Sequence, residues 1–152
     1  MSILGQIQQE LKSPKARKNA FGNYDYRCAE DILAAAKPLL AKYNALLTLS
    51  DEIVLIGNWI FFKSTAEFRA DGEHIVTTGY ARHAESKKGM DEAQISGSTS
   101  SYARKYALNG LFLIDNEQDP DSMRPDFPAA SPAPSVPQAG NRPPMPPMPP
   151  KR

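Results

Sequence analysis

The spacing of hydrophobic positions predicts two helices near the N-terminus. Over residues 3–11, apolar side chains recur on one helical face until a proline interrupts the pattern. The second segment, residues 29–43, has the same periodicity, with Glu30 and Asp31 near the positive end of the helix dipole. Pro38 lies inside it, and we expect this proline to remove one backbone hydrogen bond and to kink the helix.

Three strands are predicted after these helices, over residues 46–56, 58–69 and 74–84. Asp71-Gly72 separates the second strand from the third and favours a two-residue hairpin, because a type I′ turn needs positive φ at both positions. The register counted outward from this turn places small and apolar residues on one face, suited to packing under helices. The expected pairs on that face are Ala70 with Glu73, Phe68 with Ile75, Ala66 with Thr77, Ser64 with Gly79, and Phe62 with Ala81. A small β excursion is expected earlier, at residues 21–27.

The opposite face of this hairpin interleaves aromatic residues and cations. Its expected pairs are Arg69 with His74, Thr65 with Thr78, Lys63 with Tyr80, and Phe61 with Arg82. Such a face could stack bases while lysine and arginine meet phosphates. The pattern is more typical of an ordinary solvated sheet face, since aromatic residues favour strands in general. The pattern leaves both interpretations open.

A third helix is predicted over residues 93–109, ended by the left-handed cap pair Asn109-Gly110. Lys87 and Lys88 precede its start, where free N–H groups favour anions. Small hydroxyl residues on this helix permit close backbone approach and can bond phosphate oxygens, to which cations add charge. The alternative is a helix of small residues packed tightly against the sheet. The polar residues concerned are Gln94, Ser98, Ser100, Ser101, Arg104 and Lys105.

Composition divides the 152 residues into two parts. Twelve of the 14 prolines lie between Pro120 and Pro150, so we expect a folded domain over residues 1–117 and a disordered, Pro-rich tail over residues 118–152. The MPPMPP repeat of the tail favours polyproline II, a form suited to the groove of a protein partner. A solubilising tail without a partner explains the composition equally well.

Charge and cysteine usage narrow the classes of function. The net charge is +1, so a phosphate-binding surface must be a local patch. The single Cys28 excludes an internal disulfide and a four-cysteine zinc site, and agrees with a reducing compartment. No apolar run approaches the roughly 20 residues that span a bilayer, and the N-terminus is unlike a secretory signal. We therefore expect a protein of the cytoplasm without membrane association.

Catalytic and cofactor motifs are weak. The only histidines, His74 and His83, are expected to point to opposite faces of one strand, where they cannot share a metal. No G-x-x-x-x-G-K-[ST] loop is present to hold a nucleotide. The acidic run of residues 115–121 lacks the glycine and the terminal glutamate of a calcium loop. We expect no metal and no cofactor.

Three segments together resemble the ERF (essential recombination function) family of phage and prophage recombination proteins. They are FGNYDYRCAEDILAAAKPLL (21–40), TTGYARHAESKKG (77–89) and KKGMDEAQISGSTSSYARKYALNGLFLID (87–115). The resemblance implies an α+β core, with a three-stranded antiparallel sheet backed by helices as in other annealing proteins. It also implies single-strand DNA binding, strand annealing, and ring-like or helical oligomers.

Individual positions match the family block one at a time. The matching residues are Tyr24, Tyr26, Arg27, Lys87, Lys88, Tyr102, Arg104, Lys105 and Tyr106. Cys28 stands where the resemblance leads us to expect Ser or Thr. The region after Asp115 is short and Pro-rich, so the second C-terminal domain of longer relatives is not expected here.

The resulting hypothesis is an ATP-independent, non-catalytic protein that binds single-stranded DNA and anneals complementary strands in the bacterial host. Its expected partners are single-stranded DNA, other copies in a ring or helical filament, and a host or phage protein for the tail. One alternative is a module that protects single strands without annealing them. Another is a metal-dependent nuclease using Asp91, Glu92 or residues 115–121. The predicted DNA-binding residues are Arg27, Lys63, Tyr80, Arg82, Lys87, Lys88, Ser98, Ser101, Tyr102, Arg104 and Lys105.

Arg104 and Lys105 are expected to be surface cations whose replacement costs little fold stability. The alternative for Arg104 is a buried position that orders the helix or a subunit interface.

Overall fold

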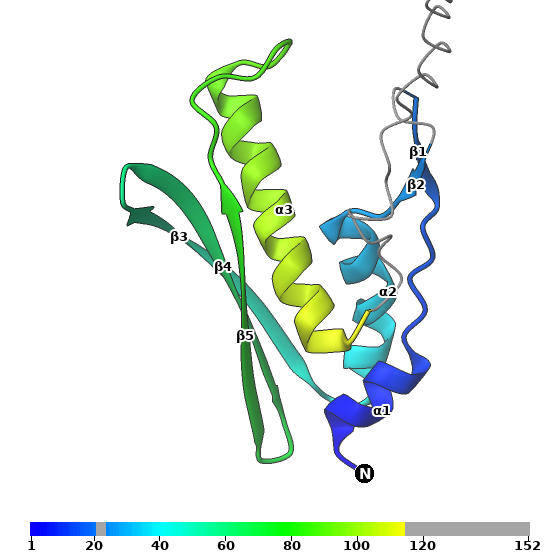
Figure 1. The fold of residues 1–152 in the computed structure, drawn as a ribbon. Helices are drawn as coiled ribbons and strands as arrows, with labels where there is room; N and C mark the ends of the chain where they lie inside the picture. Colours follow the sequence, from blue (N-terminus) through cyan, green and yellow to red (C-terminus); the bar gives the residue numbers. More distant parts are fainter. Residues whose placement is uncertain (21–23, 115–152) are drawn as a thin grey trace, which may run out of the picture. The chain divides into compact units, whose positions relative to one another are not determined.

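The computed structural model describes residues 1–20 and 24–114, which form helices on one face of a three-stranded antiparallel sheet (Figure 1). The expected α+β class is therefore confirmed, and the predicted tail lies outside the described residues. A separate two-stranded sheet pairs β1 with β2. In chain order the elements are α1 (Ile3–Glu10), β1 (Arg17–Asn19), β2 (Tyr24–Tyr26), α2 (Ala29–Lys42), β3 (Leu46–Ile56), β4 (Trp59–Ala70), β5 (Glu73–Arg82) and α3 (Glu92–Phe112).

The strand order is β3-β4-β5, and the turn between β4 and β5 sets the register. Asp71 and Gly72 have φ of 35° and 78°, as the hairpin signal requires. Every cross-strand pair predicted between these strands is confirmed, for example Phe68 with Ile75 and Lys63 with Tyr80. Side chains of β4 alternate accordingly, and the face with Ser64, Ala66, Phe68 and Ala70 is buried.

Helix α3 lies directly on β5, and Gly79 permits this close approach. A Cβ atom at Gly79 would stand 2.3 Å from the carbonyl oxygen of Ala103 and 2.4 Å from the backbone nitrogen of Ala107. The Thr77 hydroxyl donates to the Ala107 carbonyl at 2.8 Å. The main chain of α3 is therefore held against this strand, and the side chains on either flank of the helix take fixed positions over the sheet.

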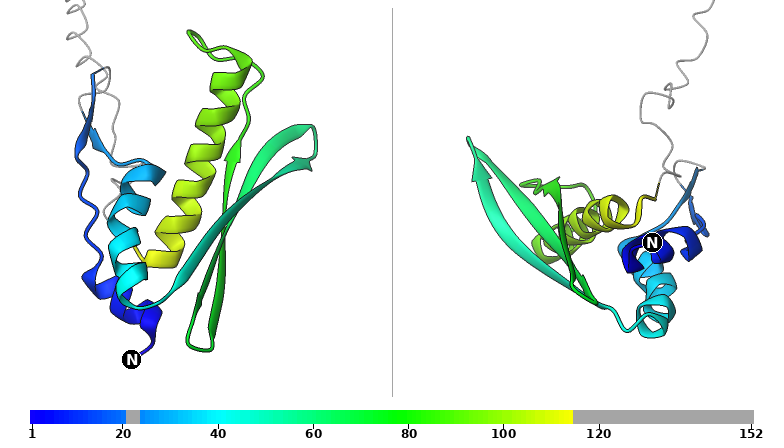
Figure 2. Two further views of the ribbon diagram at one scale, coloured as in Figure 1. Left: turned by 180° about the vertical axis from the view of Figure 1, so that it is seen from behind. Right: turned by 90° about the horizontal axis from the view of Figure 1, so that it is seen from below.

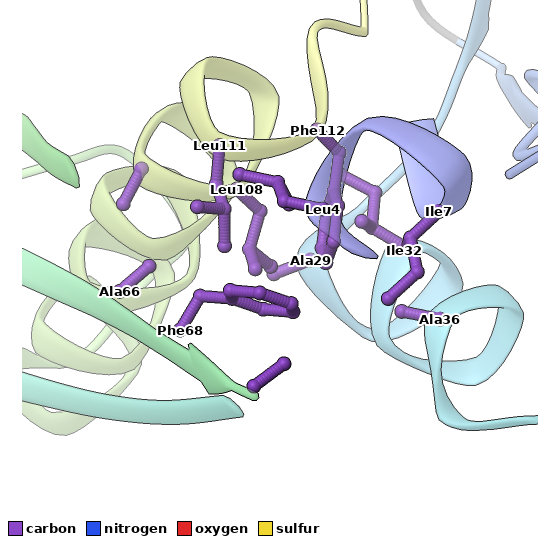
Figure 3. Packing of buried hydrophobic residues seen from close by; sticks show 12 residues of the cluster. Leu4, Ile7, Ala29, Ile32, Ala36, Ala66, Phe68, Leu108, Leu111 and Phe112 are labelled. Carbon is purple, nitrogen blue, oxygen red and sulfur yellow. The ribbon is translucent and has the colours of Figure 1, made fainter. Parts of the chain in front are cut away.

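The hydrophobic core gathers where α1, α2 and the C-terminal half of α3 meet β4 (Figure 3). Figure 2 shows α3 between the sheet and the other two helices. Phe68 projects from the sheet into this core and is fully buried. The core residues are Leu4, Ile7, Ala29, Ile32, Ala36, Ala66, Phe68, Ala70, Ala107, Leu108, Leu111 and Phe112.

The predicted end of the third helix is wrong. Instead of ending at Asn109-Gly110, α3 continues to Phe112, and Leu113 takes the left-handed conformation with φ of 53°. Leu111 and Phe112 are buried in the core, and this burial outweighs the local preference of the Asn-Gly pair for a cap. The β excursion expected at residues 21–27 contains β2, but its partner β1 was missed.

Candidate nucleic-acid interface

A hollow of about 330 Å³ lies between β5 and the N-terminal half of α3. Strand β5 is an edge strand, so side chains at this edge meet those of the helix beside it. Five predicted DNA-binding residues are brought together here: Tyr80 and Arg82 from the strand, Lys87 from the following loop, and Ser98 and Tyr102 from the helix. The remaining lining residues are Ala81, Ala84, Ile95, Thr99 and Tyr106.

Three exposed tyrosines give the hollow its aromatic character. Tyr102 and Tyr106 are four residues apart and therefore lie on the same face of α3. Their ring centroids are 6.2 Å apart and the rings are tilted by 41°. Tyr80 adds a third exposed ring at the edge strand β5, from the outer face that it shares with Lys63. Exposed aromatic faces are the surfaces on which unpaired bases stack.

Lys105 places a positive charge beside two of these rings. Its Nζ atom is 5.1 Å from the ring centroid of Tyr102 and 5.6 Å from that of Tyr106. The residue is only 9% exposed, so the expectation of a surface cation at this position is wrong. The lysine stem packs against the rings, and the ammonium adds a cation–π attraction. Lys105 therefore supports the tyrosines and raises the local positive potential.

The loop before α3 carries Lys87 and Lys88, both exposed. The sequence suggested a free anion site at the start of the helix, but the N–H groups there already have partners. The Asp91 carboxylate accepts from the Gln94 backbone N–H at 2.8 Å, and the Gln94 side chain accepts from the Asp91 N–H at 3.0 Å. This capping box satisfies backbone N–H groups at the helix start, and the Asp91 carboxylate places a negative charge there. Lys87 itself still lines the hollow.

The other flank of α3 is built from an ion pair. The Arg104 guanidinium donates from Nε to Asp51 on β3 at 3.0 Å and forms a second contact through Nη2 at 2.9 Å. The Ser100 hydroxyl donates to the same carboxylate at 2.6 Å. Burial raises the pKa of Asp51, but the hydrogen bonds from Arg104 and Ser100 outweigh it and leave the pKa below its usual range. Arg104 therefore ties α3 to β3, away from the hollow.

Comparison with known proteins identifies the family. The sequence model of the ERF superfamily matches residues 2–142. This chain belongs to the ERF superfamily. It is 52% identical over 120 residues to the Essential recombination function protein of Salmonella phage P22, an alignment covering 78% of this chain and 57% of that protein. The chain thus spans little more than half the length of its relative. No solved structure matches it.

Several predicted residues of this ERF chain lie outside the hollow. Arg27 is buried, and its Nη1 donates to the Ser13 carbonyl at 2.6 Å, so it connects two segments of the main chain. Lys63 is on the outer face of the sheet and pairs with Glu52 at 2.8 Å. Ser101 is half-buried on α3 and is not among the lining residues. Their DNA-binding roles stay predictions.

The outer sheet face, considered above as a stacking platform, has its cations engaged with neighbours. Besides the Lys63–Glu52 pair, Arg69 and His74 both contact Glu67. The Arg82 guanidinium lies over the ring of Trp59. Paired cations are less available to phosphates, so the hollow is the stronger candidate for a DNA interface in this ERF domain.

Tyr106 was matched to the family block but was left out of the predicted DNA-binding residues. Its spacing of four from Tyr102 was the available signal, because residues four apart share a helical face. The sequence did place the two histidines correctly on opposite faces: His74 bonds Glu67, whereas His83 bonds Ser96 on α3 at 3.0 Å.

Neither a metal-binding cluster nor a membrane span is found among the described residues of this ERF chain. Within residues 1–20 and 24–114, no three His, Cys, Asp or Glu side chains are grouped to hold a metal. Residues 115–121, considered for the nuclease alternative, lie outside this part. In the same ranges no helix is long and apolar enough to cross a membrane.

Proposed function

We propose that this chain binds single-stranded DNA at the hollow between β5 and α3 and anneals complementary strands during phage or prophage recombination. It would act in the bacterial cytoplasm without ATP and without a catalytic centre. The observation that carries the proposal is the convergence of three exposed tyrosines with Lys87 and Lys105 at one sheet edge. The recombination function named for the phage P22 relative supports the same process.

The hollow suits a single strand better than a duplex. Stacking on tyrosine requires a free base face, which only an unpaired base offers, and contributes about 1–3 kcal/mol per base. Every base has such a face, so binding is expected to tolerate any sequence. Lys87 and Lys88 would contact phosphates beside the rings.

Annealing then needs no bond chemistry. Neutralised phosphates let two strands approach, and several copies on each strand raise the effective concentration of complementary segments. We therefore also propose a homo-oligomer, either a ring or a helical filament.

The test is an annealing assay with purified protein and labelled complementary oligonucleotides, without nucleotide. Acceleration by the wild-type protein is expected. Lys87→Ala with Lys88→Ala should weaken binding and make the log–log salt slope shallower by about 1.4, since each single-strand phosphate contact contributes about 0.7. Lys12→Ala with Lys37→Ala removes the same charge from two exposed positions outside the hollow and serves as the control.

The second candidate is a module that protects single strands without annealing them, since one hollow per copy suffices for binding. Coating both complementary strands before mixing separates the two functions. Slower annealing than with bare DNA would favour protection. Loss of labelled oligonucleotide in magnesium or manganese would contradict a non-catalytic role.

A further inference from the structure

The tip of the β3–β4 hairpin exposes large apolar side chains that the fold does not cover. The exposed fractions are 70% for Ile53, 69% for Leu55, 51% for Ile56, 45% for Trp59 and 43% for Ile60. The ten residues from 53 to 62 contain no charged side chain. Contiguous exposed apolar surface of this kind marks an interaction site in a soluble protein.

The tip is uncovered because it extends beyond α3. The Asp51–Arg104 ion pair ties the helix to β3, and Ile53, Leu55 and Ile56, which follow Asp51 on the strand, are exposed. Figures 1 and 2 show the hairpin leaving the helix in each view. The turn itself is tight, with Gly57 at φ of 59°. The strands therefore remain paired out to Ile56 and Trp59, without a helix to bury them.

Both faces of the tip are apolar. The register pairs Leu55 with Ile60 and Ile53 with Phe62 on the side that faces the helices. Ile56 pairs with Trp59 on the outer side. An ordinary sheet strand alternates apolar and polar residues because only one face is buried. A two-sided apolar hairpin instead needs a cover on each face.

The charge and the apolar pattern of the tip indicate which kind of partner it binds. Nucleic acid is disfavoured because the ten residues carry no cation, and the cations beside them are engaged: Lys63 pairs with Glu52, and the Arg82 guanidinium lies over the Trp59 ring. The adjoining residues Asp51 and Glu52 are acidic. The same acidic residues disfavour an anionic lipid surface. A second copy of the chain supplies a matching cover, since the outer face of its hairpin is apolar like the helix-side face, apart from the Arg82 guanidinium that lies over Trp59. Charge and pattern thus point to the chain itself.

We propose that the helix-side face of one hairpin tip packs on the outer face of the next copy's tip. This inference rests on the homo-oligomer proposed above and assigns the surface that forms it. The two contacting faces differ, so the contact is heterologous, and each copy touches two others. Such contacts close into a ring or continue as a filament, whereas a contact of like faces stops at a dimer.

Two neighbouring substitutions on opposite faces test the assembly. Leu55→Glu places a charge on the helix-side face, and Ile56→Glu places one on the outer face. Both positions are exposed, so each variant should keep the wild-type melting temperature unless assembly itself contributes to it. By sedimentation velocity without DNA, the wild type is expected to be larger than a dimer and each variant monomeric. Leu46→Glu, at an exposed position at the other end of β3, is the matched control and should assemble normally.

Mixing the two variants gives the decisive result. Leu55→Glu retains an intact outer face and Ile56→Glu an intact helix-side face, so the mixture can form one good contact and should sediment as a dimer. A dimer from the mixture also shows that both variants are folded. Dimers from either variant alone would mean that like faces meet and would overturn the heterologous contact. A monomeric wild type, or variants of wild-type mass, would overturn the assembly surface altogether.

The assembly proposal at the hairpin tip and the DNA-binding proposal at the hollow can fail independently. The hollow and the tip share no residue. A monomeric variant should therefore still bind a short oligonucleotide that occupies one hollow, with the dissociation constant of the wild type for that oligonucleotide. If the wild type assembles through the tip but does not bind single strands, the assembly proposal stands and the DNA proposal falls.

Discussion

The two flanks of α3 come from one stretch of sequence and have opposite character. On the β5 flank, Tyr102 and Tyr106 leave their rings exposed over a hollow with Lys105 beside them. On the β3 flank, Ser100 and Arg104 are joined to Asp51 by hydrogen bonds. One flank offers groups to a ligand, and the other uses its polar groups within the fold.

The comparison shows that adjacent cations need not share a role. Arg104 and Lys105 are neighbours in sequence, but a step of about 100° along the helix directs them to different flanks. Arg104 reaches a carboxylate on the sheet, whereas Lys105 packs against tyrosines. A charge pair in sequence is therefore not a charge patch in space.

Gly79→Ala should have the largest effect on stability, because the close packing of α3 against β5 positions the side chains of both flanks. The added Cβ would overlap the main chain at Ala103 and Ala107, and such overpacking costs about 1–3 kcal/mol, or more where backbone must move. We expect the free energy of unfolding in urea to fall by about 3 kcal/mol.

Gly97→Ala is the control on the same helix. A Cβ there meets no atom within 4 Å, and replacing a helical glycine should add about 0.5–1 kcal/mol of stability. If Gly79→Ala unfolds at the same urea concentration as the wild type, the close packing of α3 on Gly79 does not stabilise the fold.

Replacing both helix tyrosines should separate binding from folding. Tyr102→Leu with Tyr106→Leu keeps apolar bulk and helix propensity but removes the aromatic faces. Loss of one stacked base at about 1–3 kcal/mol should raise the dissociation constant for single-stranded DNA about five- to 150-fold. The salt slope should not change, because no phosphate contact is lost. Fluorescence anisotropy measures both quantities, and unchanged affinity would refute stacking at this flank.

Arg104→Met should show the reverse behaviour. It leaves the half-buried Asp51 carboxylate without its guanidinium partner, which we expect to cost about 1–2 kcal/mol of stability. Affinity for single-stranded DNA should change little. A double-mutant cycle with Asp51→Asn should give a coupling energy of about 1 kcal/mol. If the Arg104→Met protein is fully stable but loses DNA binding, the DNA interface lies on the β3 flank instead.

Acid should weaken the contact between α3 and β3. The folded pKa of Asp51 is lowered, while the unfolded value is about 3.9. Its ionised form therefore contributes stability above about pH 4, and this contribution is lost as the pH falls toward the folded pKa. Urea unfolding of wild type and Asp51→Asn across this range should show their difference in stability narrowing with acid. A constant difference would mean that the Asp51 charge does not stabilise the fold.

Cys28→Ser should have the smallest effect and leave both flanks unchanged. Cys28 is the N-cap residue of α2, where serine is preferred, and the Asp31 carboxylate accepts its backbone N–H at 2.9 Å. A gain of a few tenths to about 1 kcal/mol is expected in thermal unfolding. Cys28→Ala lacks the hydroxyl and should show no gain.

The sequence predicted features set by local rules. Asp71-Gly72 has a strong turn preference, so the register of β4 and β5 could be counted from it. The family block located the aromatic and basic residues of the hollow. It did not reveal the partner of Arg104, because Asp51 is 53 residues away and only the fold brings them together. Lysine is rarely buried, so the burial of Lys105 against two tyrosines had no sequence signal that charge counting could use.

Two local signals were present but misinterpreted. Asp91 and Gln94 have the spacing of a capping box, yet the helix start was taken for an anion site. Asn109-Gly110 has the composition of a helix cap, but Leu111 and Phe112 are buried in the core and extend the helix. At Asn109-Gly110, burial of the following residues outweighs the local preference for a helix end. At the start of the helix, the Asp91 side chain occupies the site that a phosphate would need.

The central claim, that single-stranded DNA lies on the β5 flank, is tested most directly by photo-crosslinking. Oligonucleotides carrying a halogenated uracil crosslink to aromatic side chains that stack on the base, and mass spectrometry of the digested protein locates the bond. We expect crosslinks at Tyr102 or Tyr106, and their loss when these helix tyrosines are replaced by leucine. Crosslinks at Trp59 or Phe61, on the outer sheet face, with none at these tyrosines would contradict it.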